Sequence, residues 1–249
     1  MKTTIVAEIG SNWEGSFLKA RKIIAECKKV GADAVKFQMW RANDLYTNDH
    51  PLWSFIKKSE ITFEKAKKLK NICDNAKIEF FCSAFYPEAV DFLESLGVRR
   101  YKVASRTCLQ KDPYSYETLM QKAKSKKPII VSMGMGGSRK HIEKIFAKNK
   151  ELSFCYCVSE YPLKIERMNW SKAIQYNGLS DHTMGIIAPI VFCALKKERG
   201  SEKIIIEKHV KLKNSKGPDA STSIDTGDLG KMIRKIRVIE KLKLPLVKN

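Results

Sequence analysis

Apolar, strand-like runs alternate eight times with amphipathic, helix-like stretches along this chain. The run Ile204-Ile205-Ile206 places three β-branched residues in a row, which is typical of a strand buried on both faces. Alternation of this kind is characteristic of βα units built around a parallel sheet. At 249 residues the chain also has the length of one complete barrel of this type. We therefore predict an α/β fold, a single (β/α)8 TIM barrel that forms one domain over residues 1–249.

The boundaries of the predicted elements follow from these runs and from helix start and stop signals. The expected strands cover residues 3–8, 34–39, 79–82, 100–104, 128–132, 153–157, 178–179 and 203–207. The expected helices cover residues 17–30, 62–75, 87–96, 113–124, 139–148, 166–176, 187–198 and 225–242. A long loop at residues 41–61 follows the second strand and is a candidate wall of a binding site.

The composition fits a globular protein, since a hydrophobic content of 43% is enough for one substantial core. No run of about 18 consecutive apolar residues is present, so no membrane span is predicted. The N-terminal segment reaches the acidic Glu8 too soon for the apolar core of a signal peptide. We expect a cytoplasmic protein whose seven cysteines are reduced core thiols, with Cys155 and Cys157 on opposite faces of their strand.

The formal net charge of +20 has two interpretations. It can indicate a polyanionic partner, or it can reflect solvated helix faces that are rich in lysine. The basic residues lie on separate predicted helices and lack the interleaved aromatic residues of a nucleic-acid platform. They are Lys65, Lys67, Lys68, Lys70, Lys122, Lys124, Lys126, Lys127, Lys231, Arg234, Lys235 and Arg237. We favour solvated helix faces and expect no nucleic-acid partner, although a positive field would help to capture an anionic substrate.

Two histidines stand where neighbouring predicted strands end. His209 follows the run at residues 204–206, and His182 has a similar place after the short strand at residues 178–179. The carboxyl ends of barrel strands meet at one face, so two imidazoles there could hold a divalent metal and leave its other positions to substrate and water. Each could equally be an ordinary hydrogen-bonded histidine.

Two lysines inside predicted strands, Lys36 and Lys102, are further candidates, because lysine is rarely buried without a partner. Each needs an anion, either a bound ligand or a structural carboxylate such as Glu8 or Glu207. Serine hydroxyls at the same strand ends can donate hydrogen bonds to phosphate oxygens. These serines are Ser83, Ser105, Ser132, Ser159 and Ser180. The convergence of these groups on one barrel mouth predicts an anion pocket.

Other polar residues complete the predicted ring at the strand ends. Glu14 and Glu207 suit a general base or the orientation of a water near a metal, although Glu14 could be only a carboxylate at a helix start. Gln38 lies on the second strand and Tyr161 follows the sixth. Asp219 follows a Gly-Pro pair and could be only a turn residue.

The order of these motifs resembles the sialic acid synthase (N-acetylneuraminate synthase, NeuB-like) family. The most specific segments are Ser180-Asp181-His182-Thr183 and Glu207-Lys208-His209. The other matching segments are residues 5–15, 31–38, 101–105, 127–135, 159–162 and 217–219. The resemblance extends from about residue 5 to residue 236.

This resemblance implies a metal-dependent condensation of phosphoenolpyruvate with an aldose, commonly N-acetylmannosamine or a related sugar, that gives a nonulosonic acid and phosphate. By analogy, His182 and His209 would hold Mn²⁺ or Mg²⁺, while Glu14 and Glu207 would manage water and protons. The resemblance assigns phosphoenolpyruvate to Lys36, Ser83, Lys102, Ser105, Ser132 and Ser180. It assigns the sugar to Gln38, Tyr161 and Asp219, and we include Ser159 among the substrate-binding residues.

The chain departs from the family pattern in three places. Trp13 stands where the family usually has histidine, and Arg106-Thr107 replaces a Gly-Glu or Gly-Asp pair. Family members usually continue into an antifreeze-like domain that caps a partner's site, so we expect a homodimer or a separately encoded cap. Two other functions stay open, a metal-dependent sugar-phosphate aldolase or epimerase on the same barrel, and a non-catalytic basic barrel that binds a polyanion.

Overall fold

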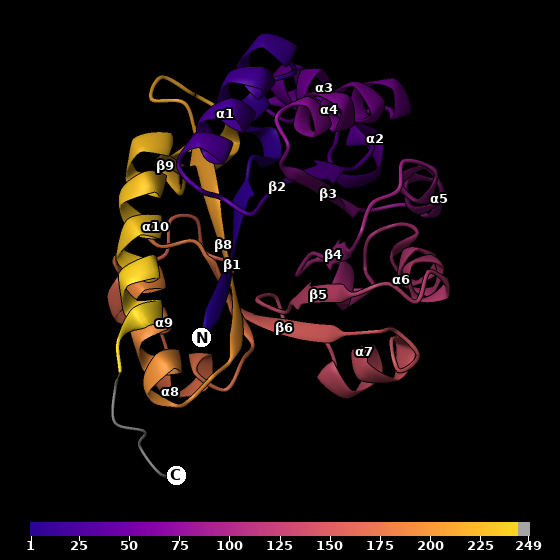
Figure 1. The fold of residues 1–249 in the computed structure, drawn as a ribbon. Coiled ribbons are helices and arrows are strands. Elements are labelled where there is room, and N and C mark those ends of the chain that lie inside the picture. The colour runs from indigo at the N-terminus through magenta and orange to yellow at the C-terminus, as the bar shows by residue number, and fades with distance from the viewer. Residues whose placement is uncertain (244–249) are drawn as a thin grey trace.

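The computed structural model describes residues 1–243 and has the predicted architecture, a closed barrel surrounded by helices (Figure 1). Each of the first eight strands is parallel to the next, and β1 pairs with β8 to close the ring. The barrel strands are β1 (Lys2–Glu8), β2 (Ala34–Met39), β3 (Glu79–Ala84), β4 (Tyr101–Val103), β5 (Ile129–Ser132), β6 (Leu152–Cys157), β7 (Gly178–Asp181) and β8 (Lys203–Lys211). A two-residue strand, β9 (Ile224–Asp225), pairs with the end of β8.

Helices cover the outside of the barrel. They are α1 (Phe17–Lys29), α2 (Ala42–Leu45), α3 (Trp53–Ser59), α4 (Phe63–Asn75), α5 (Pro87–Ser95), α6 (Ser115–Lys124), α7 (Arg139–Ile145), α8 (Trp170–Ala173), α9 (Ile187–Glu198) and α10 (Thr226–Lys241). Side chains cap five of these helices by accepting a hydrogen bond from a backbone N–H in the first turn, and the capping residues are Ser16, Thr62, Ser138, Asn169 and Asp225.

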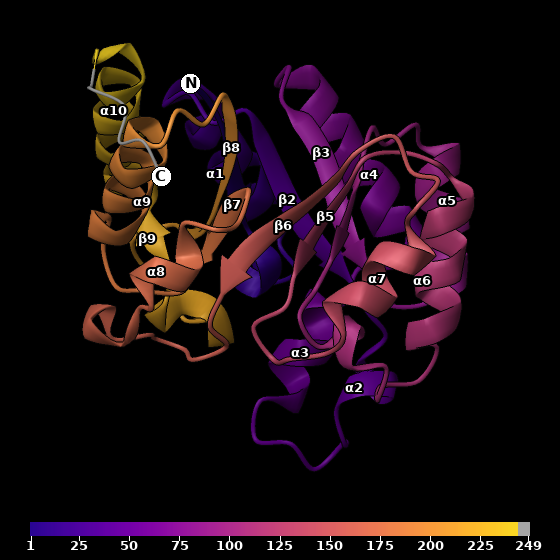
Figure 2. The same ribbon diagram turned by 90° about the horizontal axis from the view of Figure 1, so that it is seen from below.

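The structure departs from the predicted elements in three places that affect their number or the position of a site residue. The segment at residues 41–61 contains the short helices α2 and α3, which project from the barrel (Figure 2). The helix predicted at residues 166–176 is only a 3₁₀ turn followed by α8, because the Asn169 side chain accepts from Lys172 N and starts a new helix there. Strand β8 continues four residues beyond its predicted end, so His209 lies within the strand rather than after it.

The barrel interior is layered, which positions the functional side chains. One buried apolar cluster consists of Val6, Ala34, Phe81, Ile130, Cys155 and Ile205. Side chains two residues apart on a strand point to the same face of the sheet. The residues two positions after those of the apolar cluster therefore form the next layer towards the carboxyl ends of the strands. That layer contains Glu8, Lys36, Ser83, Ser132, Cys157 and Glu207. The apolar layer is therefore the floor of a polar site.

The cysteine predictions are confirmed in part. All seven cysteines are free thiols, and six of them are buried while Cys157 is half-buried. The prediction that Cys155 and Cys157 point to opposite faces is wrong, because side chains two residues apart on a strand share a face. Cys155 belongs to the apolar floor and Cys157 lies above it.

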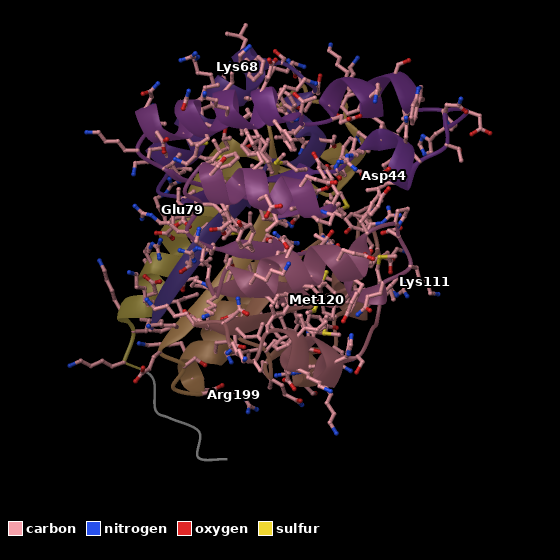
Figure 3. All side chains as sticks on the ribbon, turned by 90° about the vertical axis from the view of Figure 1, so that its right-hand side faces the viewer. Asp44, Lys68, Glu79, Lys111, Met120 and Arg199 are labelled. Carbon is pink, nitrogen blue, oxygen red and sulfur yellow. The ribbon has the colours of Figure 1, made fainter. Side chains whose placement is uncertain are left out.

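Most of the lysines predicted on solvated helix faces are exposed or half-buried, as Lys68 on α4 illustrates in Figure 3. Lys122 is an exception, since its side chain is fully buried. No helix among residues 1–243 combines the length and apolar character that a membrane span requires.

Candidate active site

A pocket of about 360 Å³ opens among the carboxyl ends of the barrel strands. This volume lies in the range of small-molecule binding sites. Most predicted site residues line it: Lys36, Gln38, Lys102, Ser105, Ser132, Ser159, Tyr161, Ser180, His182, Glu207, His209 and Asp219. Seven other residues complete the wall: Tyr46, Phe85, Ala104, Arg106, Met135, Cys157 and Pro218.

Four buried charges of alternating sign lie at the base of the pocket. Lys102 Nζ is 2.6 Å from Glu207 Oε1, and Lys36 Nζ is 3.7 Å from Glu207 Oε2. Lys36 also forms an ion pair with Glu8. Both lysines are only 2% exposed, so these structural carboxylates supply the partners that burial demands. The lysines still line the pocket, where a bound anion would complete their coordination.

The two carboxylates of this cluster differ in their pKa values. Burial raises the pKa of Glu8 to about 7, although its contact with Lys36 opposes the shift. Burial would also raise the pKa of Glu207, but Lys102 and Lys36 outweigh it and hold that pKa well below its usual range. Glu207 is therefore ionised at neutral pH.

The serines provide hydroxyl groups around the lysines. Ser180 Oγ donates to Glu207 Oε1 over 2.8 Å, and Ser83 Oγ accepts from Lys36 Nζ over 3.2 Å. Ser83 therefore supports Lys36 from beside the pocket instead of lining it. The Oγ atoms of Ser132 and Ser159 are buried without a hydrogen-bond partner within residues 1–243. Such unpaired buried hydroxyls are costly, which suits groups that bind a polar ligand.

The two predicted metal ligands meet at the mouth of β7 and β8, with ring centroids 5.5 Å apart. His182 Nδ1 is 2.7 Å from the carbonyl oxygen of Val158 and donates to it, which leaves the lone pair of Nε2 available. His209 Nδ1 is buried and has no hydrogen-bond partner in the described part of the chain. Burial lowers the pKa of His209 to about 3, so its imidazole is neutral.

These two histidines fit a metal site that is open on its substrate side. Metal-binding imidazoles are neutral, and their second nitrogen is commonly held by a carbonyl oxygen, as that of His182 is. Residues 1–243 contain no group of three His, Cys, Asp or Glu side chains arranged to hold a metal ion. A metal at this place would thus have two protein ligands, with its remaining positions left for substrate and water.

Comparison with known proteins decides the family. A model of the NeuB family matches residues 23–244 of this chain. The chain belongs to the NeuB family. The predicted resemblance to sialic acid synthases is thereby confirmed.

Named relatives and solved structures agree with the NeuB assignment. Pseudaminic acid synthase of Campylobacter jejuni is 33% identical over 266 residues, which cover 96% of this chain and 74% of that protein. N,N'-diacetyllegionaminic acid synthase of Legionella pneumophila is 30% identical over 271 residues, which cover 96% of this chain and 73% of that protein. The crystal structure of N-acetylneuraminic acid synthetase from Leptospira borgpetersenii has a TM-score of 0.83 at 28% identity and covers 96% of this chain and 84% of that one.

These relatives confirm two further predictions. The single (β/α)8 barrel is the fold that this chain shares with the Leptospira structure. The prediction of an enzyme of the carbon–carbon bond-forming synthase type is also confirmed, since the matching relatives with established names are synthases.

Two departures from the NeuB pattern lie outside the pocket wall. Trp13 is fully buried beside Phe17, with ring centroids 5.6 Å apart, and it packs between the barrel and the helices. Thr107 is also buried. The third position, Arg106, does line the pocket, and its guanidinium donates to Asp112 from Nε over 2.6 Å and from Nη2 over 2.7 Å. This NeuB member therefore presents a carboxylate-bound arginine at the mouth.

The structure does not bring Glu14 to the pocket. Its carboxylate forms an ion pair with Lys19 and accepts from Lys216 N over 3.3 Å. Asp219, by contrast, lines the mouth, and its Oδ2 accepts from both N and Oγ of Ser11, at 2.9 and 2.6 Å. A catalytic role for Glu14 stays a prediction, and Asp219 is more than a turn residue.

Sequence reasoning missed five wall residues of chemical interest. Tyr46 comes from the segment at residues 41–61, which was predicted to form a wall but not resolved into residues. Phe85 and Met135 follow the ends of β3 and β5, so an examination of the residues after each strand would have identified them. Arg106 lies in the turn after β4 and is oriented by Asp112, which the sequence does not indicate. Cys157 was predicted only as a core thiol on the face opposite to that of Cys155. Its sulfur lies 3.9 Å from His182 Nδ1 and 3.6 Å from Ser105 Oγ.

Proposed function

We propose that this NeuB-family protein condenses phosphoenolpyruvate with an aldose, N-acetylmannosamine or a related amino sugar, and releases a nonulosonic acid and phosphate. The observation that carries the proposal is the pocket itself, which joins a buried lysine and serine cradle to a pair of histidines. The names of its relatives, synthases of pseudaminic, legionaminic and sialic acids, support the product class. We further propose that residues 1–249 form one synthase domain that acts in the cytoplasm.

The cradle suits phosphoenolpyruvate, which carries a phosphate and a carboxylate. Lys36 and Lys102 would supply positive charge, and the hydroxyls of Ser105, Ser132 and Ser180 would donate to the ligand oxygens. Glu207 and, in part, Glu8 offset the charge of the lysines, so the site carries only a small positive charge. A trianionic ligand is thus held by hydrogen-bond donors as much as by net charge.

The histidines face the acceptor half of the reaction. His182 and His209 would hold Mn²⁺ or Mg²⁺, and the bound ion would supply Lewis acidity that polarises the aldehyde of the sugar. Tyr161, whose ring centroid lies 4.2 Å from that of His182, would close the site over the aldehyde. Gln38 and Asp219 would bind sugar hydroxyls, and Gln38 is fixed by donating to Glu8 Oε1 over 3.0 Å.

In the proposed reaction, C3 of phosphoenolpyruvate attacks the aldehyde carbon, water adds at C2, and phosphate leaves by cleavage of the C2–O bond. Glu207 Oε2 is buried and has no hydrogen-bond partner within residues 1–243. Because Glu207 is ionised, this oxygen can accept a hydrogen bond from the incoming water and orient it. Its role is orientation, since its low pKa makes it a weak base.

The test is release of phosphate from phosphoenolpyruvate in the presence of Mn²⁺ or Mg²⁺ and a panel of aldoses with and without N-acetyl groups. We expect release with at least one N-acetylated aldose and none without an aldose. A sugar-phosphate aldolase or epimerase would need no phosphoenolpyruvate. A polyanion-binding barrel would bind nucleic acid in a salt-sensitive manner that survives loss of both histidines.

The assay should be repeated with a separately produced antifreeze-like domain, because a homodimer or a cap supplied in trans is part of the proposal. Activity that appears only with the added domain would support the synthase function and a need for the cap. Failure of every aldose to release phosphate, with either metal and with the cap present, would refute the proposal.

A further inference from the structure

A lysine outside the pocket has an environment that the proposed reaction does not explain. The side chain of Lys122, on α6, is fully buried, whereas Met120 two residues earlier lies on the outer face of the same helix (Figure 3). Lys122 Nζ donates to the carbonyl oxygens of Ala84, over 2.8 Å, and of Lys102, over 3.0 Å. No carboxylate within residues 1–243 pairs with it.

The two carbonyl groups belong to the ends of β3 and β4, where the barrel wall is weakest. Strand β4 has three residues, and its register with β3 consists of the single pair Ser83 and Lys102. The ammonium group of Lys122 bridges these strands at the same level, from the helix side of the barrel. It therefore adds two hydrogen bonds at the place where the backbone ladder contributes least.

The bridge lies directly behind the proposed phosphoenolpyruvate cradle. The carbonyl group that Lys122 holds on β4 belongs to Lys102, whose own ammonium lines the pocket and is bound to Glu207. On β3 the bridge holds Ala84, the residue after Ser83, which bonds Lys36. Movement of the end of β4 would therefore displace Lys102 itself, and movement of the end of β3 would displace Ser83, which accepts a hydrogen bond from Lys36.

Burying this ammonium is unfavourable. Burial, together with the nearby charges of Lys36 and Lys102, lowers the pKa of Lys122 to about 7. A leucine or methionine at this helix position would fill the space without that penalty. The two hydrogen bonds to β3 and β4 are the compensating feature that the described residues offer.

We infer that Lys122 is a positioning residue for phosphoenolpyruvate binding, which fixes the ends of β3 and β4 so that Lys36 and Lys102 face the ligand at the correct separation. This inference rests on the proposed function. It assigns Lys122 no contact with substrate, and it predicts an effect on one substrate and not on the other.

The experiment compares Lys122→Met, which keeps the volume but has no donor, with Lys122→Gln, which keeps a neutral donor on a shorter side chain. The matched control is Lys124→Met, because Lys124 is exposed on the same helix and donates to the side chain of Gln121. Binding of phosphoenolpyruvate is measured by calorimetry, and KM is measured separately for phosphoenolpyruvate and for the aldose.

For Lys122→Met we expect phosphoenolpyruvate binding about tenfold weaker or more, because misplacement of a positioning group by a fraction of an ångström is enough for such a loss. The Gln variant should be intermediate, the aldose KM should change less than about threefold, and the control should match the wild type.

A folded Met variant that binds phosphoenolpyruvate like the wild type would overturn the inference while leaving the proposed function intact. Equal losses for both substrates would also overturn it, since they indicate general destabilisation. If neither variant folds, Lys122 serves the fold itself and the assignment fails. If the wild type does not bind phosphoenolpyruvate, the proposed function is refuted, and the inference about Lys122 is refuted with it because it rests on that function.

Discussion

Lys208 Nζ donates to Asp181 Oδ2 over 2.6 Å, and neither side chain has any exposure to solvent. Each residue directly precedes one of the two pocket histidines, His182 and His209. Asp181 also accepts from N and Oγ1 of Thr183, at 3.0 and 3.1 Å. Since neighbouring side chains on a strand point to opposite faces, the ion pair lies behind the histidines and ties β7 to β8. The pair thus adds a side-chain link to the backbone ladder between the two strand ends that carry the imidazole rings.

Loss of either partner should therefore be costly. We expect Asp181→Asn or Lys208→Met to lower the free energy of unfolding by about 3–5 kcal/mol, because each leaves an uncompensated buried charge or polar group. Urea unfolding followed by circular dichroism measures the change. The double variant should lose less than the sum of the single losses, because it removes both charges together.

The exposed pair Lys70 and Asp74 is the matched control, because its ions are also 2.6 Å apart but Asp74 is 55% exposed. Asp74→Asn should cost less than about 1 kcal/mol. Comparable losses at the two sites would show that burial does not govern the contribution of the Asp181 pair.

The proposed metal role of His209 predicts a loss of turnover without a loss of fold. His209→Ala should reduce phosphate release by about a thousandfold or more, since removal of one of two protein ligands should abolish binding of the Lewis acid. His141→Ala is the control, because His141 is exposed on α7. Chelation of divalent metals should inactivate the wild type reversibly. Activity of the His209 variant near the wild-type level would exclude the metal role.

Lys102 should act mainly on phosphoenolpyruvate. We expect Lys102→Met to raise the KM for phosphoenolpyruvate at least about tenfold, since it removes a charge-assisted donor from the cradle. It also removes the nearest of the cations that hold down the pKa of Glu207, so that pKa should rise. The acidic limb of the rate profile should consequently move to higher pH. An unchanged KM and an unchanged acidic limb would both contradict this arrangement.

The fold could be predicted from the sequence because each element has a local cause. Alternating apolar and amphipathic runs indicate βα units whatever their tertiary contacts. The predictions failed where polar residues had distant partners. Strand β8 was predicted to end at Glu207 because polar residues follow the apolar run at residues 204–206, yet Lys208 pairs with Asp181 and Lys211 donates to the carbonyl oxygen of Ala220.

The site could also be predicted from local sequence patterns, except where a side chain depends on a partner that is distant in the fold. Position on a strand determines which side chains reach the mouth, so His182, Lys36 and Lys102 were found from strand ends and strand interiors. Arg106 could not be placed this way, because it lies in the turn after β4 and its orientation depends on Asp112. The burial of Lys122 could not be predicted from the sequence either, because its hydrogen-bond acceptors are backbone carbonyl oxygens on two strands.

Arg106 should influence the choice of sugar. Its guanidinium is held by Asp112 at the pocket wall, beyond the cradle residues, so Arg106→Ala should raise the aldose KM several-fold and leave the phosphoenolpyruvate KM nearly unchanged. Arg234→Ala, at an exposed position on α10, is the control. Steady-state kinetics with each aldose of the panel measure the effect. A larger change in the phosphoenolpyruvate KM than in the aldose KM would instead assign Arg106 to the phosphoenolpyruvate cradle.

The burial of Lys122 predicts a distinctive dependence of stability on pH. Its pKa is lowered from 10.5 to about 7 by burial, so between these values the unfolded chain binds a proton that the native state does not. The stability that Lys122 contributes is then complete above pH 10.5 and is lost as the pH falls towards 7. The difference in unfolding free energy between wild type and Lys122→Met should rise by about 1.4 kcal/mol for each pH unit in this window, and be level below it. Urea titrations of both proteins at several pH values measure it, and a difference that is constant from pH 7 upwards would show that Lys122 keeps its proton in the native state.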